Sequence, residues 1–377
     1  MALTSVGSAG TTRSQTPVRD RTFKGAVSDK AYNRCYYLAV IDPYKDTNFN
    51  FRRGLGQAVT LNRTSISTKL VMTQSVEKMG LAIDFTITKK IPKQDQKSKN
   101  SMTLKIYNLS RYNSDRMNVG DVVQLDCGYN NDIANVFTGT ITRISSTTKG
   151  PDKCTTIIAT EMPRPNPKQM VKMGSITMPR GTNEREFCER LCQTLVDVVP
   201  NLVDYDMSEV PAIYTSLKPR VLFGIDFVDT LLRVLSKYRM RYVIRSGVII
   251  AVPHGGNKTF VMTDINPSNG LINVAMGQGK KEKLGKGKDA KEIFVPGYRV
   301  SSLLNNKLQL GDWIRVRDTV DLDPKPTISE LLHIEKLTIK GNSFAGVWQT
   351  CMDAYIRPLP KDNDDVKDIV WVNDREF

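Results

Sequence analysis

The stretch that decides the fold is LKIYNLSRYNSDRMNVGDVVQLDCGYNNDIANVFTGTITRISSTTKGPDKCTTIIATE, residues Leu104–Glu161. Apolar and polar side chains alternate in it on both sides of Asn118–Asp121, and this period of two is typical of half-buried β-strands. Clusters of Asn, Asp and Gly separate the runs, and Ser110 is placed to begin a short helical turn. Short strands joined by tight turns predict an antiparallel sandwich or small barrel.

The same pattern returns near the C-terminus, between Leu310 and Asp353. In each copy a Gly-Asp pair is expected to open a strand and a Lys-Gly pair to turn a hairpin, and the two pairs are equally far apart in both copies. Such turns are common, so the spacing alone also fits coincidence. The strand pattern around them favours a duplicated β-barrel. The predicted scaffold turns are Gly120, Asp121, Gly150, Gly311, Asp312 and Gly341.

The composition is that of a globular protein, since 40% of the 377 residues are hydrophobic and 25% are charged. No apolar run approaches the roughly 20 residues that a membrane-spanning helix needs, and the first residues lack the apolar core of a secretory signal. The formal net charge of +15 favours polyanionic neighbours, such as nucleic acid, an anionic membrane or an acidic protein surface. A basic surface matched to acidic subunits of a larger assembly is the alternative.

Changes in composition divide the chain into five predicted segments. A proline-rich stretch, Met162–Pro167, is too stiff to continue a strand. After it, helices are expected from Asn183 and from about Asp226, followed by the hairpin Arg241–Val252. The fold class is therefore mainly β with an α/β insert, in which two similar antiparallel β-barrels flank a small α/β module. The segments are an extended N-terminal arm (1–34), the first barrel (35–162), the insert (163–262), the second barrel (263–357) and a C-terminal arm (358–377).

Two segments are candidates for contacts with partners. Met276–Glu292 is rich in lysine and glycine and is expected to be a flexible basic loop, with contact to DNA or an acidic partner as the sharper alternative. It lacks the Gly-x-x-x-x-Gly-Lys-[Ser/Thr] pattern of a phosphate-binding loop. Ile369–Val372 is a short apolar run that either packs on its own domain or adds a strand to a neighbouring subunit. The candidate contacts are Lys280, Lys281, Lys283, Lys286, Lys288, Ile369, Val370, Trp371 and Val372.

The chain carries no recognisable catalytic motif. Its two histidines, His254 and His333, lie outside any nucleophile motif, and a structural role is expected for both. Cys188 and Cys192 are one helical turn apart, but no second Cys or His pair lies near them in the sequence to complete a metal site. We therefore expect no catalytic residue, no cofactor and no metal. A two-carboxylate hydrolase leaves no reliable sequence signature, so a cell-wall hydrolase stays as an alternative.

Several short motifs, in their order along the chain, resemble bacteriophage baseplate hub proteins. Those that resemble the first barrel of that family are Asn108-Leu109-Ser110, Asn118–Leu125, Gly128-Tyr129, Phe137–Ile141 and Lys149–Asp152. Those that resemble its second barrel are Asn266–Ile272, Val300–Asn305, Leu310–Asp312 and Gly346–Thr350. The helix and hairpin between Asp226 and Val252 resemble the α/β insert of the family, so the resemblance covers roughly Leu81–Arg357.

The resemblance implies a structural protein with tail-tube-like barrels, located in the tail baseplate of a virion and assembled in the host cytoplasm. It implies a homotrimer whose six barrels form a pseudo-six-fold ring between a hexameric tail tube and a trimeric central spike. The implied partners are the tail tube protein and the central spike protein, with the tape measure protein and other baseplate proteins as further candidates. A basic β-barrel protein that binds nucleic acid directly is the alternative, although aromatic residues are not interleaved with the basic runs.

Overall fold

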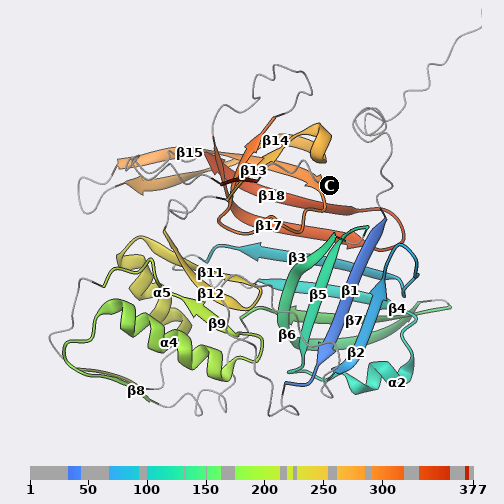
Figure 1. Cartoon of the computed structure of the whole chain (residues 1–377), viewed down its shortest axis with the longest axis horizontal. Coiled ribbons are helices and arrows are strands. Elements are labelled where there is room, and N and C mark those ends of the chain that lie inside the picture. Colours follow the sequence, from blue (N-terminus) through green and yellow to red (C-terminus); the bar gives the residue numbers. More distant parts are fainter. Residues whose placement is uncertain are drawn as a thin grey trace, which may run out of the picture.

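The computed structural model describes residues 33–43, 68–92, 100–130, 132–149, 151–162, 175–212, 219–223, 227–253, 261–284, 291–317, 331–356 and 370–372. Most of this chain is β-strand; the two longer helices lie together beside the large sheet, and a short helix lies at the opposite end of the molecule (Figure 1). The predicted fold class, mainly β with an α/β insert, is confirmed.

The first β unit is antiparallel throughout, in the strand order β3-β4-β7-β6-β5-β1-β2. A six-residue helix, α2 (Arg111–Arg116), is capped by Ser110, whose side chain accepts a hydrogen bond from the Asn113 N–H. This confirms the helical turn predicted to begin at Ser110. The strands are β1 (Arg34–Ile41), β2 (Thr68–Gln74), β3 (Ile83–Lys90), β4 (Ser101–Tyr107), β5 (Val122–Tyr129), β6 (Asp132–Lys149) and β7 (Asp152–Thr160).

The insert has its own apolar core between two helices and a three-stranded sheet. Asn183 caps α4 (Glu184–Val198), because its side chain accepts a hydrogen bond from the Glu186 N–H at 2.7 Å. The apolar face expected from 3.6-residue spacing is the face that the helix buries. The other elements are β8 (Ser175–Met178), β9 (Asp204–Asp206), β10 (Arg220–Phe223), α5 (Phe227–Lys237), β11 (Met240–Arg245) and β12 (Val248–Pro253).

The second β unit repeats the central strand order of the first. Its order β14-β15-β18-β17 corresponds to β3-β4-β7-β6, and β16 lies beside β17 as β5 lies beside β6. The elements are β13 (Val261–Ile265), the 3-10 helix η1 (Pro267–Asn269), β14 (Leu271–Leu284), β15 (Lys291–Leu303), β16 (Trp313–Val316), β17 (Leu332–Asn342), β18 (Trp348–Ile356) and β19 (Val370–Val372).

The two units are joined into one 14-stranded sheet, because β17 pairs antiparallel with β3 from Lys336↔Lys90 to Asn342↔Asp84. One continuous apolar core lies under both units. The second unit is antiparallel, as predicted, except at β13, which pairs in parallel with both β16 and β19. The counterpart of β13 in the first unit is β1, which pairs antiparallel with β5.

The lysine-rich stretch Met276–Glu292 is not the loop that its composition suggested. Strand β14 continues to Leu284 and β15 begins at Lys291, so most of the stretch forms the arms of a long antiparallel hairpin. Residues 285–290 lie outside the described residues. Alternation is weak in this hairpin because much of it has no second layer to bury one face, and the sequence pattern therefore does not indicate strands there.

Candidate functional site: the repeated turns

The first repeated turn, Asn118–Asp121, is closed at both ends by hydrogen bonds. The Asp121 N–H donates to the Asn118 carbonyl oxygen at 3.2 Å, and the Asp121 Oδ2 accepts from the Asn118 N–H at 2.7 Å. Gly120 has a φ of 100°, the left-handed value that a type II turn requires at its third position. A side chain there would strain the backbone, which explains the glycine.

The second repeated turn, Gln309–Asp312, has the same geometry. The Asp312 N–H donates to the Gln309 carbonyl oxygen at 3.3 Å, the Asp312 Oδ2 accepts from the Gln309 N–H at 2.8 Å, and Gly311 has a φ of 85°. The two turns differ in their first two residues but adopt one structure, because each has glycine third and aspartate fourth, where the geometry needs them.

Each turn is tied to the middle of a long strand by the same pair of backbone hydrogen bonds. The Gly120 N–H donates to Ile141 O at 2.9 Å and the Ile141 N–H donates to Asp121 O at 2.8 Å. In the second unit, Gly311 and Asp312 make these two bonds with Ile334, both at 3.0 Å. A β-bulge follows each isoleucine, between Ile141 and Arg143 in β6 and between Ile334 and Lys336 in β17. The likeness of the two units therefore extends beyond the turns into the strands.

Of the two remaining scaffold positions, the structure describes Gly341 alone. Gly150 lies outside the described residues. The prediction that Lys340-Gly341 turns a hairpin is wrong, because Gly341 lies inside β17, opposite Trp348 on β18 and Phe85 on β3. A Cβ built on Gly341 would come within 2.3 Å of the Phe85 ring. Glycine is required there for close packing against an aromatic ring, and this need is invisible in the sequence.

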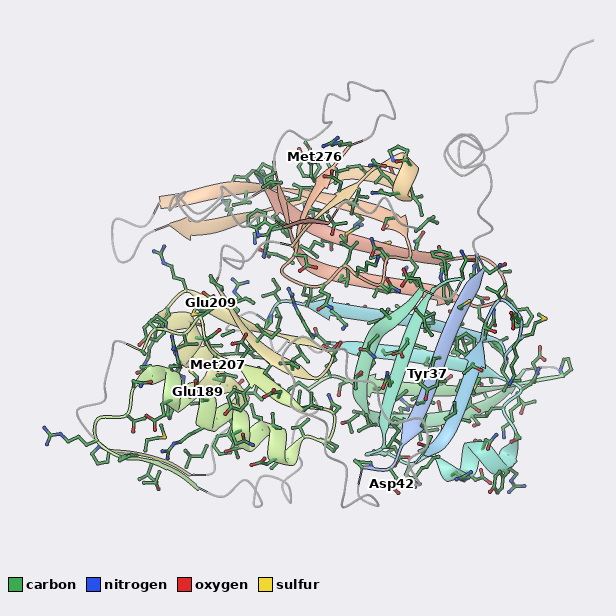
Figure 2. All side chains as sticks on the ribbon, viewed as in Figure 1. Tyr37, Asp42, Glu189, Met207, Glu209 and Met276 are labelled. Carbon is green, nitrogen blue, oxygen red and sulfur yellow. The ribbon has the colours of Figure 1, made fainter. Side chains whose placement is uncertain are left out.

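Each aspartate of the turns also forms an ion pair, with a cation that the sequence analysis did not identify. The Lys69 ammonium, from β2, lies 2.7 Å from Asp121 Oδ1 and 3.3 Å from an oxygen of Asp42, which follows β1 (Figure 2). In the second unit the cation comes from the insert: Arg245 Nη2 lies 2.9 Å from Asp312 Oδ1 and donates to the Leu310 carbonyl oxygen at 2.9 Å. In both turns Oδ2 of the aspartate accepts from a backbone N–H and Oδ1 lies against the cation. In the first turn the Lys69 ammonium also donates to Oδ2, at 2.9 Å.

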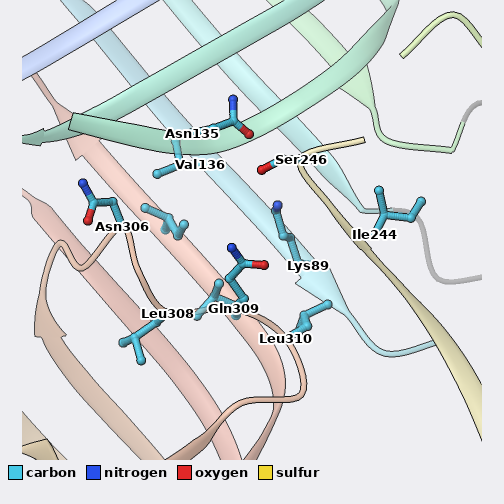
Figure 3. A pocket seen from close by; sticks show the side chains of 11 residues that line it. Lys89, Asn135, Val136, Ile244, Ser246, Asn306, Leu308, Gln309 and Leu310 are labelled. Atoms are coloured by element: carbon cyan, nitrogen blue, oxygen red, sulfur yellow. The ribbon is translucent and has the colours of Figure 1, made fainter. Parts of the chain in front are cut away.

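In the described part of the chain, the insert covers the second turn and leaves the outer residue of the first turn exposed. Leu310 is 2% exposed, whereas Val119, at the same position of the first turn, is 65% exposed. A small pocket marks the place where the insert hairpin, β3 and the second turn meet (Figure 3). Its lining includes Lys89, Asn135, Ile244, Ser246, Gln309 and Leu310. Burial raises the pKa of Asp312, and Arg245 and the Gln309 N–H only partly offset this effect.

The candidate partner contacts lie in different parts of the second unit. Lys280 is turned onto its own chain, where its ammonium pairs with Glu335 at the β17 bulge and lies 4.3 Å from the centroid of the Tyr355 ring. Lys281 is exposed and Lys283 lies in β14. Val370–Val372 form β19, which pairs with β13 of the same chain, so the own-domain alternative holds for this strand. Lys286, Lys288 and Ile369 lie outside the described residues.

The remaining titratable groups are built into the core. Cys188 and Cys192 both face the interior of the insert, and burial is the largest cause that raises the pKa of each thiol, for Cys188 to about 12. His333 is buried with its ring 5.3 Å from that of Trp313. Within the described ranges, no three His, Cys, Asp or Glu side chains are grouped as metal ligands would be. No helix of the same ranges is long and apolar enough to cross a membrane.

The equivalence of the turns predicts equal effects of one substitution at two sites. Gly120→Ala and Gly311→Ala are each expected to lower the free energy of unfolding by about 1–2 kcal/mol, because alanine is strained at positive φ. Space is not the cause, since a Cβ on Gly120 meets nothing within 4 Å and one on Gly311 meets only Arg245 at 3.7 Å. Urea unfolding at fixed protein concentration measures both effects. Val119→Ala, at an exposed position, is the control, and a cost at one glycine alone would contradict the equivalence.

No family model and no curated protein matches the chain. Solved structures that are similar to it include components of phage tails and of type VI secretion systems. A tail protein from Neisseria meningitidis MC58 is 9% identical over 74% of this chain and 93% of its own, with a TM-score of 0.46.

A second similar structure is the 43 kDa tail protein of prophage MuSo2 from Shewanella oneidensis. It is 8% identical over 76% of this chain and 96% of its own, with a TM-score of 0.48. An Escherichia coli component of the type VI secretion system is 10% identical over 74% of both chains, with a TM-score of 0.45. Its description notes a structural similarity to the T4 bacteriophage tail proteins gp27 and gp5.

Proposed function

We propose that this protein is a structural, non-catalytic hub of a phage tail baseplate. Three chains form a ring with pseudo-six-fold symmetry, which joins a hexameric tail tube to a trimeric central spike. The ring belongs to the virion tail and is assembled in the host cytoplasm. This proposal follows the family that the sequence motifs resemble, and it assigns a role to the duplication of the β unit within one chain.

The observation that carries the proposal is the repetition of one turn, one strand junction and one bulge in a single chain. The same set of hydrogen bonds, from backbone N–H groups to carbonyl oxygens and to one aspartate oxygen, forms in Asn118–Asp121 with Ile141 and in Gln309–Asp312 with Ile334. Three copies of a chain with two like units provide six like positions around a three-fold axis. A six-fold partner and a three-fold partner can therefore both be matched by one protein.

The insert supplies the difference between the two units that a three-fold partner needs. It is tied to the second turn by Arg245 and buries Leu310, while Val119 of the first turn is bare. In a trimer, three of six like turns would be covered and three open. We propose that the trimeric spike recognises this alternation, and that the hexameric tube contacts features that both units share.

The test is the mass of the purified protein, alone and mixed with the tail tube protein and the spike protein of the same phage. Native mass spectrometry is expected to give three times the 42.3 kDa chain mass, and the same trimer is expected in complexes with tube and spike. A species that stays monomeric and binds neither partner would overturn the proposal. Binding to DNA that weakens steeply with salt, in place of binding to the tube, would favour the nucleic-acid alternative.

A further inference from the structure

One side of β17 is shared by two strands, and this arrangement joins the two units of the chain. Near its start β17 pairs with β16, through Trp313↔His333 and Ile314↔Leu332. Beyond the bulge the same side pairs with β3, through Lys336↔Lys90 to Asn342↔Asp84. The opposite side of β17 is occupied along its length by β18.

Strand β6 is built in the same way, but half of one side is open. It pairs with β5 from Asp132 to Thr140, and with β7 from Thr140 to Lys149 on its other side. In the described part of the chain, no strand pairs with the β5 side of β6 beyond the bulge, over residues 143–149. An open edge of this length is a template for pairing with another strand.

A second open edge lies on β14, and pairing across the sheet shows that β14 is the counterpart of β3. In the first unit, one row of directly paired residues runs Ile87, Met102, Ala159, Ile141. In the second unit, the corresponding row runs Met276, Tyr298, Ala354, Ile334. Strand β3 has β17 on its outer side, whereas β14 has no outer neighbour among the described residues.

We infer that the open edge of β6 in one protomer pairs antiparallel with β14 of the next, in the register that β17 and β3 use within the chain. Ser146 stands as far beyond Ile141 as Ile339 stands beyond Ile334, and Ile339 is opposite Ile87. The register therefore places Ser146 opposite Met276 and Thr148 opposite Val274. The inference rests on the proposed ring and specifies the surface through which a second copy of this chain binds.

The side chains of β14 are those of a strand that lacks its neighbour. Ile87 in β3 is fully buried, but Met276 at the corresponding position is 81% exposed. Figure 2 places Met276 at the outer margin of the molecule, in the second unit. A large apolar side chain on an open strand edge is the arrangement expected where another chain binds.

The two joints also differ in a complementary way. Within the chain, Gly341 faces Phe85, and a Cβ on Gly341 would meet that ring at 2.3 Å. In the inferred joint, Thr148 takes the place of Gly341, and the smaller Val274 takes the place of Phe85. The large Phe85 thus faces a glycine within the chain, and the middle-sized Val274 faces a threonine in the inferred joint. A threonine in the place of Gly341 would overlap the Phe85 ring, so the open edge of β6 does not fit against β3. The edges of β6 and β17 therefore do not exchange partners.

Cysteine cross-linking across the open edges tests the register. The in-register variant carries Ser146→Cys and Met276→Cys, and the off-register control carries Ser146→Cys and Val274→Cys. Directly opposite Cβ atoms lie about 4.5–5.5 Å apart, and diagonal neighbours are farther. The parent protein, with its six free cysteines, and the two single variants report any background. Oxidation is followed on a non-reducing gel, and native mass is measured on the same samples.

The in-register variant is expected to form a covalent dimer and then a trimer as the final product, at least tenfold more than the off-register control. A ladder that continues past three would overturn the inference, because an open chain of contacts would replace the ring. A trimer by native mass without this cross-link would overturn the register and leave the proposed hub intact. A monomer, alone and with tube protein, would overturn both.

Discussion

Phe85→Ala is expected to lower the free energy of unfolding by about 4 kcal/mol, because it empties the core at the junction of the two units. The Phe85 side chain is almost fully buried, packs edge-on against Trp348 at 5.4 Å between ring centroids, and fills the space above Gly341. Urea unfolding at fixed protein concentration, followed by tryptophan fluorescence, measures the loss. Thr86→Ala, at the exposed neighbouring position of β3, is the control and should cost less than about 0.5 kcal/mol.

The same contact predicts a compensating pair of substitutions. Gly341→Val alone is expected to cost about 1–3 kcal/mol or more, because the new side chain overlaps the Phe85 ring. In the double variant Phe85→Ala with Gly341→Val, the valine enters the space that the ring has left. The loss in the double variant should therefore fall short of the sum of the two single losses by at least about 1 kcal/mol. Strict additivity would show that the two positions do not share one space.

Arg245→Ala is expected to lower the free energy of unfolding by about 3 kcal/mol at pH 8, because it leaves the carboxylate of Asp312 buried without its cation. The Leu310 carbonyl oxygen loses a donor in the same step. Arg111→Ala is the matched control: it removes an arginine from the exposed pair with Asp115 and should cost less than about 0.5 kcal/mol.

The cost of Arg245→Ala should shrink as the pH falls. Burial already raises the pKa of Asp312 in the folded protein, and loss of Arg245 removes one of the effects that lower it. A carboxyl group whose pKa is higher in the folded than in the unfolded state binds more protons when folded, so stability falls as the pH rises between the two values. The penalty therefore shrinks as the pH falls below the folded-state pKa, and it is gone below the unfolded-state pKa, where the group is neutral in both states.

Removing the charge tests this cause directly. Asp312→Asn keeps a side-chain oxygen that can accept from the Gln309 N–H, so the double variant Arg245→Ala with Asp312→Asn should be more stable at pH 8 than Arg245→Ala alone. Its stability relative to the parent should also vary less between pH 8 and pH 5. A loss in Arg245→Ala that is independent of pH would show that packing, and not the buried charge, is the cause.

The strands and helices with one buried face could be predicted from the sequence. Met102, Leu104 and Ile106 alternate with polar residues because β4 buries every second side chain, and α4 shows helical spacing because it buries a stripe. The duplicated Gly-Asp turns were visible for a similar reason: positive φ and a carboxylate acceptor are needed within four neighbouring residues. Such local requirements leave a record in neighbouring positions of the chain.

The cations of the turns, the function of Gly341 and the strand nature of Met276–Leu284 could not be predicted in this way. Lys69 and Arg245 reach their aspartates from remote segments, and nothing local distinguishes them from other basic residues. Gly341 is glycine because of Phe85, which belongs to the other unit. A hairpin that is largely exposed on both faces lacks the alternation of apolar and polar residues that indicates a strand.

By itself, the sequence determined that this protein is mainly β, that a β unit occurs twice and that an α/β module lies between the copies. These properties follow from patterns within a few turns or strands. The tertiary structure alone decided how the copies are joined, which turn the insert covers and which strand edges stay open. Those outcomes depend on pairing between residues far apart in the chain, where geometry, and not local spacing, selects the partner.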